Sequence, residues 1–113
     1  MVKVEIVESL FEEIEAKFKR EASKIFDFIE SIQENSHKGK IVGNVGGIVI
    51  KELKYEKFRF YFLVDEFKLK FADQATLVDI LIKFVRMSDK KTQQKTIEEI
   101  KRILQIIGSE GFD

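Results

Sequence analysis

The chain has no cysteine, no proline and no tryptophan, and a single histidine, His37, among its 113 residues. Without cysteine it forms no disulfide, and with one histidine it lacks the two or more Cys and His ligands that a zinc site usually uses. A Ser-His-Asp hydrolase would need His37 as its base, but no nucleophile motif accompanies it. We therefore expect no metal, no cofactor and no hydrolase of the triad class.

Long apolar runs and an excess of charge are also missing. No apolar run reaches the roughly 18 residues of a membrane span, and the first residues lack the apolar core of a secretory signal, so we expect a cytoplasmic protein. Twenty basic residues balance 20 acidic ones. Acidic residues crowd the first third, however, and Lys and Arg gather at 51–59 and 83–95. A neutral chain with this distribution can carry a basic patch for nucleic acid.

The first third is predicted to be mainly helical. Hydrophobic residues make up 44% of the chain, enough for the core of a single domain over 1–113. Residues 2–6 alternate apolar and polar side chains, as a half-buried strand does. Ser9 and Glu12 have the pattern of a capping box, and apolar residues then follow at helical spacing to about residue 34. This pattern allows one long helix or a helical hairpin with a tight break near 19–23.

The middle of the chain is predicted to be a run of strands. Polar residues and glycines indicate an irregular stretch over 35–47. Apolar alternation and β-branched residues then predict strands at Ile48–Tyr55, Phe58–Val64, Phe67–Phe71 and Thr76–Arg86. Phe58, Phe60 and Phe62 share one strand face and should pack against the N-terminal helices.

A second capping-box pattern, Thr96 with Glu99, predicts a final helix, and Gly108 suits its C-cap. Helices on either side of a run of strands indicate an α+β domain. We expect an antiparallel sheet of three to five strands, with the N-terminal helix or helical hairpin on one face and a short C-terminal helix. The other sheet face should be open.

Two segments resemble a known family at the level of residues. The stretch 48–62 has a strand with basic residues, a short turn, and then an aromatic residue, Arg59, an apolar residue and a second aromatic. The stretch 80–86 is a hydrophobic strand that leads, after Met87-Ser88-Asp89, into the lysine-rich helix start Lys90-Lys91-Thr92-Gln93. Both are similar to the RelE/ParE toxin superfamily, and most similar to its phage-derived, HigB-like branch. The likeness covers 48–104 in motifs and the preceding residues in element order only.

The resemblance implies a toxin of a type II toxin–antitoxin pair that cleaves mRNA on the ribosome and so inhibits translation. Cleavage by attack of a 2′-hydroxyl on the adjacent phosphate needs a base, an acid and cations, which Lys, Arg, His and Tyr can supply without a metal. The expected partners are a cognate antitoxin and the ribosome with its mRNA, with homodimerisation left open and no membrane partner. The implied catalytic residues are Arg59, Arg86, Lys51 and Lys54, and the implied RNA-binding residues are Lys90, Lys91 and Tyr61.

Two other functions stay open. A non-catalytic RelE-fold protein that binds a protein or a nucleic acid is favoured by the neutral charge and by Ile97, which stands where the family pattern has proline. A ParE-like gyrase inhibitor would share the fold without the RNase residues. Because strand faces alternate, only one of Lys51 and Lys54 can share the face of Arg59. Arg59 is expected to be solvent-facing, so that Arg59→Ala would leave the fold intact.

Overall fold

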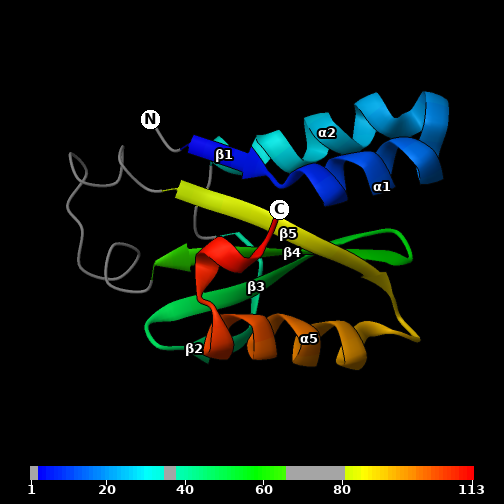
Figure 1. Cartoon of the computed structure of the whole chain (residues 1–113). Helices are drawn as coiled ribbons and strands as arrows, with labels where there is room; N and C mark the ends of the chain where they lie inside the picture. Colours follow the sequence, from blue (N-terminus) through cyan, green and yellow to red (C-terminus); the bar gives the residue numbers. More distant parts are fainter. Residues whose placement is uncertain (1–2, 35–37, 66–80) are drawn as a thin grey trace.

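The computed structural model describes residues 3–34, 38–65 and 81–113. Its strands form one five-stranded sheet in the order β1-β5-β4-β3-β2 (Figure 1). The strands are β1 (Lys3–Ile6), β2 (Lys40–Val45), β3 (Ile48–Tyr55), β4 (Phe58–Asp65) and β5 (Leu81–Asp89). Neighbours are antiparallel except that β1 runs parallel to β5. The predicted α+β class is confirmed, whereas the predicted strand Phe67–Phe71 and the start of Thr76–Arg86 lie outside the described residues.

The N-terminal helices form a hairpin, which was one of the two arrangements that the sequence allowed. Helix α1 (Glu8–Phe18) and helix α2 (Ala22–Glu30) are joined by a single 3-10 turn, where Lys19 takes a positive φ of 50°. The rings of Phe11 and Phe26 stack across the two helices with centroids 4.5 Å apart. The predicted capping box is wrong, because Val7 is the N-cap and the Ser9 hydroxyl instead donates to the backbone oxygen of Asp113.

Strand β2 occupies part of the stretch that the sequence predicted to be irregular. It pairs with β3 through a two-residue turn in which Gly46 and Gly47 have φ of 57° and 84°. Positive φ at both central residues is the geometry of a type I′ hairpin turn, which glycine adopts without strain. Gly43 lies where a β-bulge shifts the register. The expectation that these glycines serve turns or a bulge is confirmed, but strand β2 was missed because such glycines look the same in sequence as those of a loop.

Different helices cover the two faces of the sheet. Phe18 and Phe28 of the helical hairpin touch the rings of Phe58 and Tyr55, on the same face as the buried Phe60 and Phe62. This confirms the predicted packing of the Phe-rich face. Helix α5 (Gln93–Ile106) lies on the opposite face, and the side chains that it buries are Ile97, Ile100 and Leu104. The prediction that one face is open is therefore wrong.

Helix α5 begins earlier than the sequence predicted. Its N-cap is Thr92, and Thr96 lies within the helix. The Asp89 carboxylate accepts hydrogen bonds from the Thr92 backbone N–H at 2.9 Å and hydroxyl at 3.0 Å. Residues 87–89, which interrupt the family-like pattern, simply extend β5. The C-cap is Ile107, one residue before the predicted Gly108; Gly108 follows it with φ of 99° and an N–H that donates to the Ile103 carbonyl at 3.1 Å.

Within the described ranges, no helix is both long enough and apolar enough to cross a membrane.

Candidate nucleic-acid interface

The strand register sorts the predicted site residues onto two faces. Lys54 pairs with Arg59 across β3 and β4, and Tyr61 pairs with Arg86 across β4 and β5. These four side chains therefore belong to the face beneath α5. Lys51 pairs with Phe62 and belongs to the opposite face. The prediction that only one of the two lysines shares the face of Arg59 is confirmed, and that lysine is Lys54.

Arg59 is buried beneath α5 rather than solvent-facing. Its residue is 8% exposed, and its Nε lies 3.5 Å from Oε1 of Glu52, which is also 8% exposed. Its Nη1 donates to the Lys57 carbonyl at 3.1 Å, while Nε–H finds no hydrogen-bond acceptor among the described residues. The Gln93 side-chain amide donates to the second oxygen of Glu52 at 2.9 Å. The positive charge of Arg59 is thus held against a buried carboxylate and is largely hidden from solvent.

Tyr61 is enclosed in the same layer. Its hydroxyl lies 2.8 Å from the Ser88 hydroxyl, and its ring is fully buried. Burial raises the pKa of the Tyr61 hydroxyl above its usual value. A stacked RNA base needs an exposed aromatic face, so the enclosed ring of Tyr61 presents no such surface.

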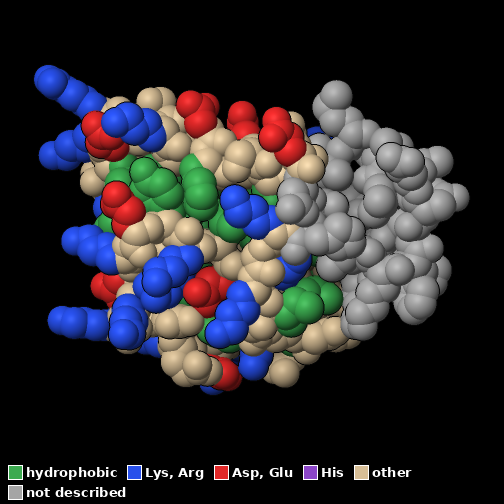
Figure 2. All heavy atoms as spheres, turned by 180° about the vertical axis from the view of Figure 1, so that it is seen from behind, with side chains coloured by type: hydrophobic (Ala, Val, Ile, Leu, Met, Phe, Trp, Pro, Cys, Tyr) green, Lys and Arg blue, Asp and Glu red, His purple; other side chains and the backbone are tan. Residues whose placement is uncertain are grey.

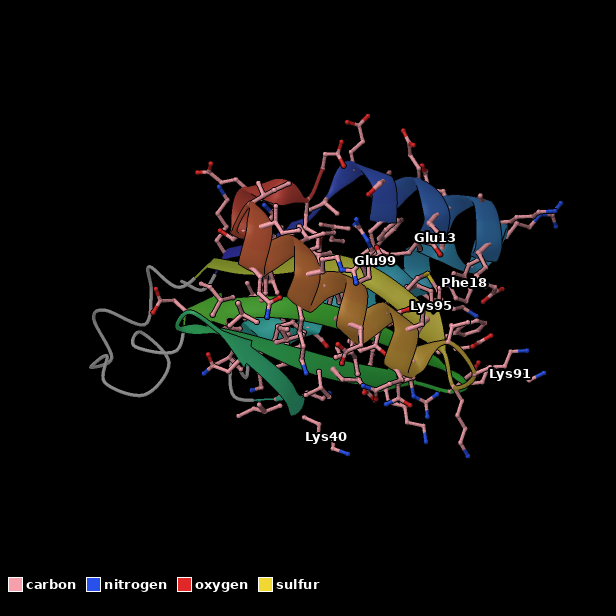
Figure 3. All side chains as sticks on the ribbon, turned by 60° about the horizontal axis from the view of Figure 1, so that its bottom comes forward. Glu13, Phe18, Lys40, Lys91, Lys95 and Glu99 are labelled. Atoms are coloured by element: carbon pink, nitrogen blue, oxygen red, sulfur yellow. The ribbon has the colours of Figure 1, made fainter. Side chains whose placement is uncertain are left out.

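Arg86 lies between two helices and is partly accessible. Its Nε donates to Oε1 of Glu99 on α5 at 2.8 Å, and its side chain is 24% exposed. Its guanidinium also lies 5.1 Å from the ring centroid of Phe112. Glu13 of α1 is the second carboxyl near Arg86, and Figure 3 labels Glu13 on α1 and Glu99 on α5. Partial burial raises the pKa of Glu13, against the opposing effects of Lys17 and Arg86.

Lys51 lies on the face covered by the helical hairpin. It is 3% exposed, and its Nζ sits 5.9 Å from the ring centroid of Phe62. Burial lowers the pKa of its ammonium group. This position places Lys51 on the other side of the sheet from Arg59 and Arg86, so the structure does not bring the four predicted catalytic residues into one group.

Seven of the 13 exposed Lys and Arg side chains among the described residues lie at one end of the molecule, which we call the basic end. It consists of the connections at 17–21, 54–57 and 89–92, and these join α1 to α2, β3 to β4, and β5 to α5 (Figure 1). The three connections carry seven exposed Lys or Arg and three exposed Asp or Glu. The cations are Lys17, Lys19, Arg20, Lys54, Lys57, Lys90 and Lys91. Figure 2 shows Lys and Arg side chains projecting from this end, at the left edge of that view.

Contacts around Phe58 hold the three connections together. Phe58 pairs with Tyr55 in the β3–β4 turn and with Asp89 at the end of β5. The Phe18 ring meets the Phe58 ring edge-on, with centroids 5.0 Å apart. Lys17 also lies near enough to Asp89 to help lower the pKa of that carboxyl, after the larger effect of its hydrogen bonds from Thr92. The basic end is therefore one surface.

The sequence predicted part of this surface. Lys54, Lys90 and Lys91 were among the predicted site residues and lie in the basic end. The contribution of α1 was missed, because Lys17, Lys19 and Arg20 follow an acidic stretch and reach this end only through the helical hairpin. The sequence signal was the local reversal of charge at 17–20. His37 lies outside the described residues.

Comparison with known proteins gives no match, whether to a family model, to a curated protein or to a solved structure. Among the residues that the structure describes, no group of three or more His, Cys, Asp or Glu side chains could hold a metal ion.

Proposed function

We propose that this protein is a RelE-like domain that binds RNA through its basic end without cleaving it. The observation that carries the proposal is the convergence of three separate connections, with seven exposed cations, on one end of a chain with no net charge. The resemblance of 48–104 to the RelE/ParE superfamily supports RNA as the polyanion. The occupied state of Arg59, held by Glu52, favours binding over catalysis.

Electrostatics supports this interface despite the carboxylates within it. Glu21 is paired with Lys24 at 2.8 Å, and Asp89 accepts hydrogen bonds from Thr92. Lys24 balances the charge of Glu21, whereas Asp89 stays negatively charged, and seven cations against three carboxylates still give the basic end an excess of positive charge. Lysines that neutralise phosphates release condensed counterions, so binding at such a surface weakens steeply as salt rises. Other acidic side chains lie outside the basic end, and Figure 2 shows several along the upper edge, where the N-terminal helices run.

A salt titration of RNA binding tests the proposal. A single-stranded RNA oligonucleotide is titrated with wild type, with Lys57→Gln/Lys91→Gln, and with the control Lys3→Gln/Arg102→Gln. The control removes the same charge from exposed positions outside the basic end. The slope of log K against log salt is negative, and we expect it to become shallower by about 1.4 in the first variant, since each lost single-strand contact removes about 0.7. The slope of the control should equal that of wild type.

Three results would overturn RNA binding at the basic end: no salt-dependent binding by wild type, an equal loss in both variants, or tighter binding to anionic lipid vesicles than to RNA. Full retention of affinity by the Lys57→Gln/Lys91→Gln variant would also place the interface elsewhere.

A second candidate is the ribosome-dependent endoribonuclease of a toxin–antitoxin pair, and one observation favours it. Arg86 is partly accessible and lies near Glu13, whose pKa is raised by burial. An arginine can stabilise the charge of a reacting phosphate, and a carboxyl with a raised pKa can act as acid or base. This candidate requires growth arrest on induction, mRNA cleavage detected by primer extension, and neutralisation by a co-expressed antitoxin. Cleavage that Arg86→Ala lowers about 100-fold would favour it over the non-catalytic function.

A further inference from the structure

Phe58 stands at the centre of the basic end with part of its surface exposed. Two ammonium groups lie over its ring, Lys17 Nζ at 5.4 Å and Lys57 Nζ at 5.5 Å from the centroid. The Phe18 ring supports it from α1 at an interplanar angle of 79°. Figure 3 shows that Phe18 lies at the same end of the molecule as Lys91. A partly exposed aromatic ring thus has two lysine ammonium groups over it, one from each of two connections.

This combination matches the chemistry of an unpaired nucleotide. Proteins that bind single-stranded RNA stack bases on aromatic rings and hold the backbone with cations. In a duplex the base faces are already stacked on one another, so a ring at the protein surface cannot reach them. Cation–π contacts at an exposed site are weaker than stacking of a base on an aromatic ring. A base can therefore displace the two lysines from the ring, and the freed ammonium groups can then reach the flanking phosphates.

We propose that Phe58 stacks an unpaired base and that Lys17 and Lys57 bind the phosphates on either side of it, so that the basic end selects single-stranded over duplex RNA. The inference rests on the proposed RNA binding and adds the class of RNA that is recognised. It distinguishes Phe58 from Phe11, which is 40% exposed but stacks on Phe26 within an acidic stretch of α1. Phosphates would be repelled from that position.

A tryptophan probe tests the stacking directly, because the chain has no tryptophan of its own. Phe58→Trp places a single indole at the proposed stacking position, and Phe11→Trp places one at the control position. We expect a single-stranded oligonucleotide to quench the fluorescence of Phe58→Trp, whereas a duplex of the same sequence at saturation does not. Phe11→Trp should respond to neither RNA. Equal quenching of Phe58→Trp by both RNAs, or quenching by neither despite binding, would overturn the proposal.

Affinities of leucine variants provide the second measurement. Phe58→Leu keeps an apolar side chain against Phe18 and removes the aromatic face. We expect its affinity for the single strand to fall on the order of 10-fold, and its affinity for the duplex to stay within about 2-fold of wild type. Phe11→Leu should match wild type for both RNAs. A thermal melt of each variant confirms that it is folded, and Phe58→Trp retains an aromatic ring where Phe58→Leu does not fold.

The two proposals fail in different ways. If wild type binds single strand and duplex equally and Phe58→Leu changes neither affinity, selection by Phe58 is wrong while RNA binding at the basic end stands. If wild type binds neither RNA, the proposed function itself is wrong.

Discussion

At the scale of single residues, the buried ion pair of Arg59 and Glu52 makes a testable contribution to stability. Both residues are 8% exposed, and Gln93 of α5 holds the second oxygen of Glu52. Two charges buried together cost desolvation energy that their attraction only roughly offsets, but one charge left alone is much worse. The pair therefore matters mainly through what happens when it is broken.

A double-mutant cycle checks this reasoning. We expect Arg59→Met to destabilise the fold by about 3 kcal/mol, because Glu52 would keep a buried charge without its partner. The double variant Arg59→Met/Glu52→Leu should return to within about 1 kcal/mol of wild type, since neither charge is left. Urea denaturation gives the four free energies of unfolding. Additive losses in the cycle would contradict coupling of the two side chains, and an unchanged stability of Arg59→Met alone would contradict the expected cost of the unpaired Glu52.

Lys51 provides a prediction that depends on pH. Burial lowers the pKa of its ammonium group below 10.5, so the folded state is penalised wherever the group is charged in both states. As pH rises from the folded pKa towards 10.5, the unfolded chain keeps the proton that the folded chain releases, and stability gains. Lys51→Met should be more stable than wild type at neutral pH by about 1 kcal/mol, because a buried charge is replaced by an apolar group.

Urea unfolding at neutral pH and just below 10.5 measures this gain. The advantage of Lys51→Met should shrink at the higher pH. Lys54→Met serves as the matched control, because Lys54 is an exposed lysine on the same strand and should show no such change. A constant advantage at both pH values would mean that packing of the methionine, and not the charge, is the cause.

At the scale of elements, the turn between β2 and β3 decides whether the edge strand forms. Gly46 and Gly47 both have positive φ, but other residues adopt the φ of Gly46 more readily than the φ of Gly47. Asn takes the left-handed region readily, so Gly46→Asn, at φ of 57°, should change stability by no more than a few tenths of a kcal/mol. Gly47→Val, at φ of 84°, should cost about 1–3 kcal/mol, because a β-branched residue is strained there.

Thermal melts of the two glycine variants test the hairpin, and amide exchange locates the effect. Protection should be lost first in β2 and at its partners in β3. Equal stability of both variants would argue against a turn of this type.

The elements also show how far sequence reasoning reached. Period-two alternation correctly assigned the Phe-rich face and the opposite faces of Lys51 and Lys54, because those depend only on strand geometry. The choice between one helix and a hairpin stayed open, since the break occurs at Lys19, a residue with no local turn preference. The burial of Arg59 was missed because it arises from the docking of α5, which is a tertiary event. The full extent of the basic end was missed for the same reason, because its three parts are far apart in sequence and only the tertiary fold brings them together.

At the scale of the whole molecule, the distribution of charge matters more than its sum. The chain has no formal net charge and a sequence pI near 6.6, so a uniform charge distribution would give weak retention on a polyanionic resin at neutral pH. A concentrated basic end predicts clear retention on heparin, because local potential governs such contacts. Lys57→Gln/Lys91→Gln should elute at lower salt than Lys3→Gln/Arg102→Gln, although the two variants have equal net charge. Identical elution would contradict a localised surface.

The parallel pairing of β1 with β5 has a consequence for how the chain folds during synthesis. Lys3 pairs with Leu81 and Ile6 with Phe84, so the first strand meets its partner only after the rest of the sheet has been made. At the usual rate of translation, β1 waits on the order of ten seconds for that partner. Pairing of such distant segments also slows folding, because loop closure must come first. The nascent helical hairpin can meet Tyr55 and Phe58 of β3 and β4 as soon as those strands are made, but β1 stays unpaired until β5 follows.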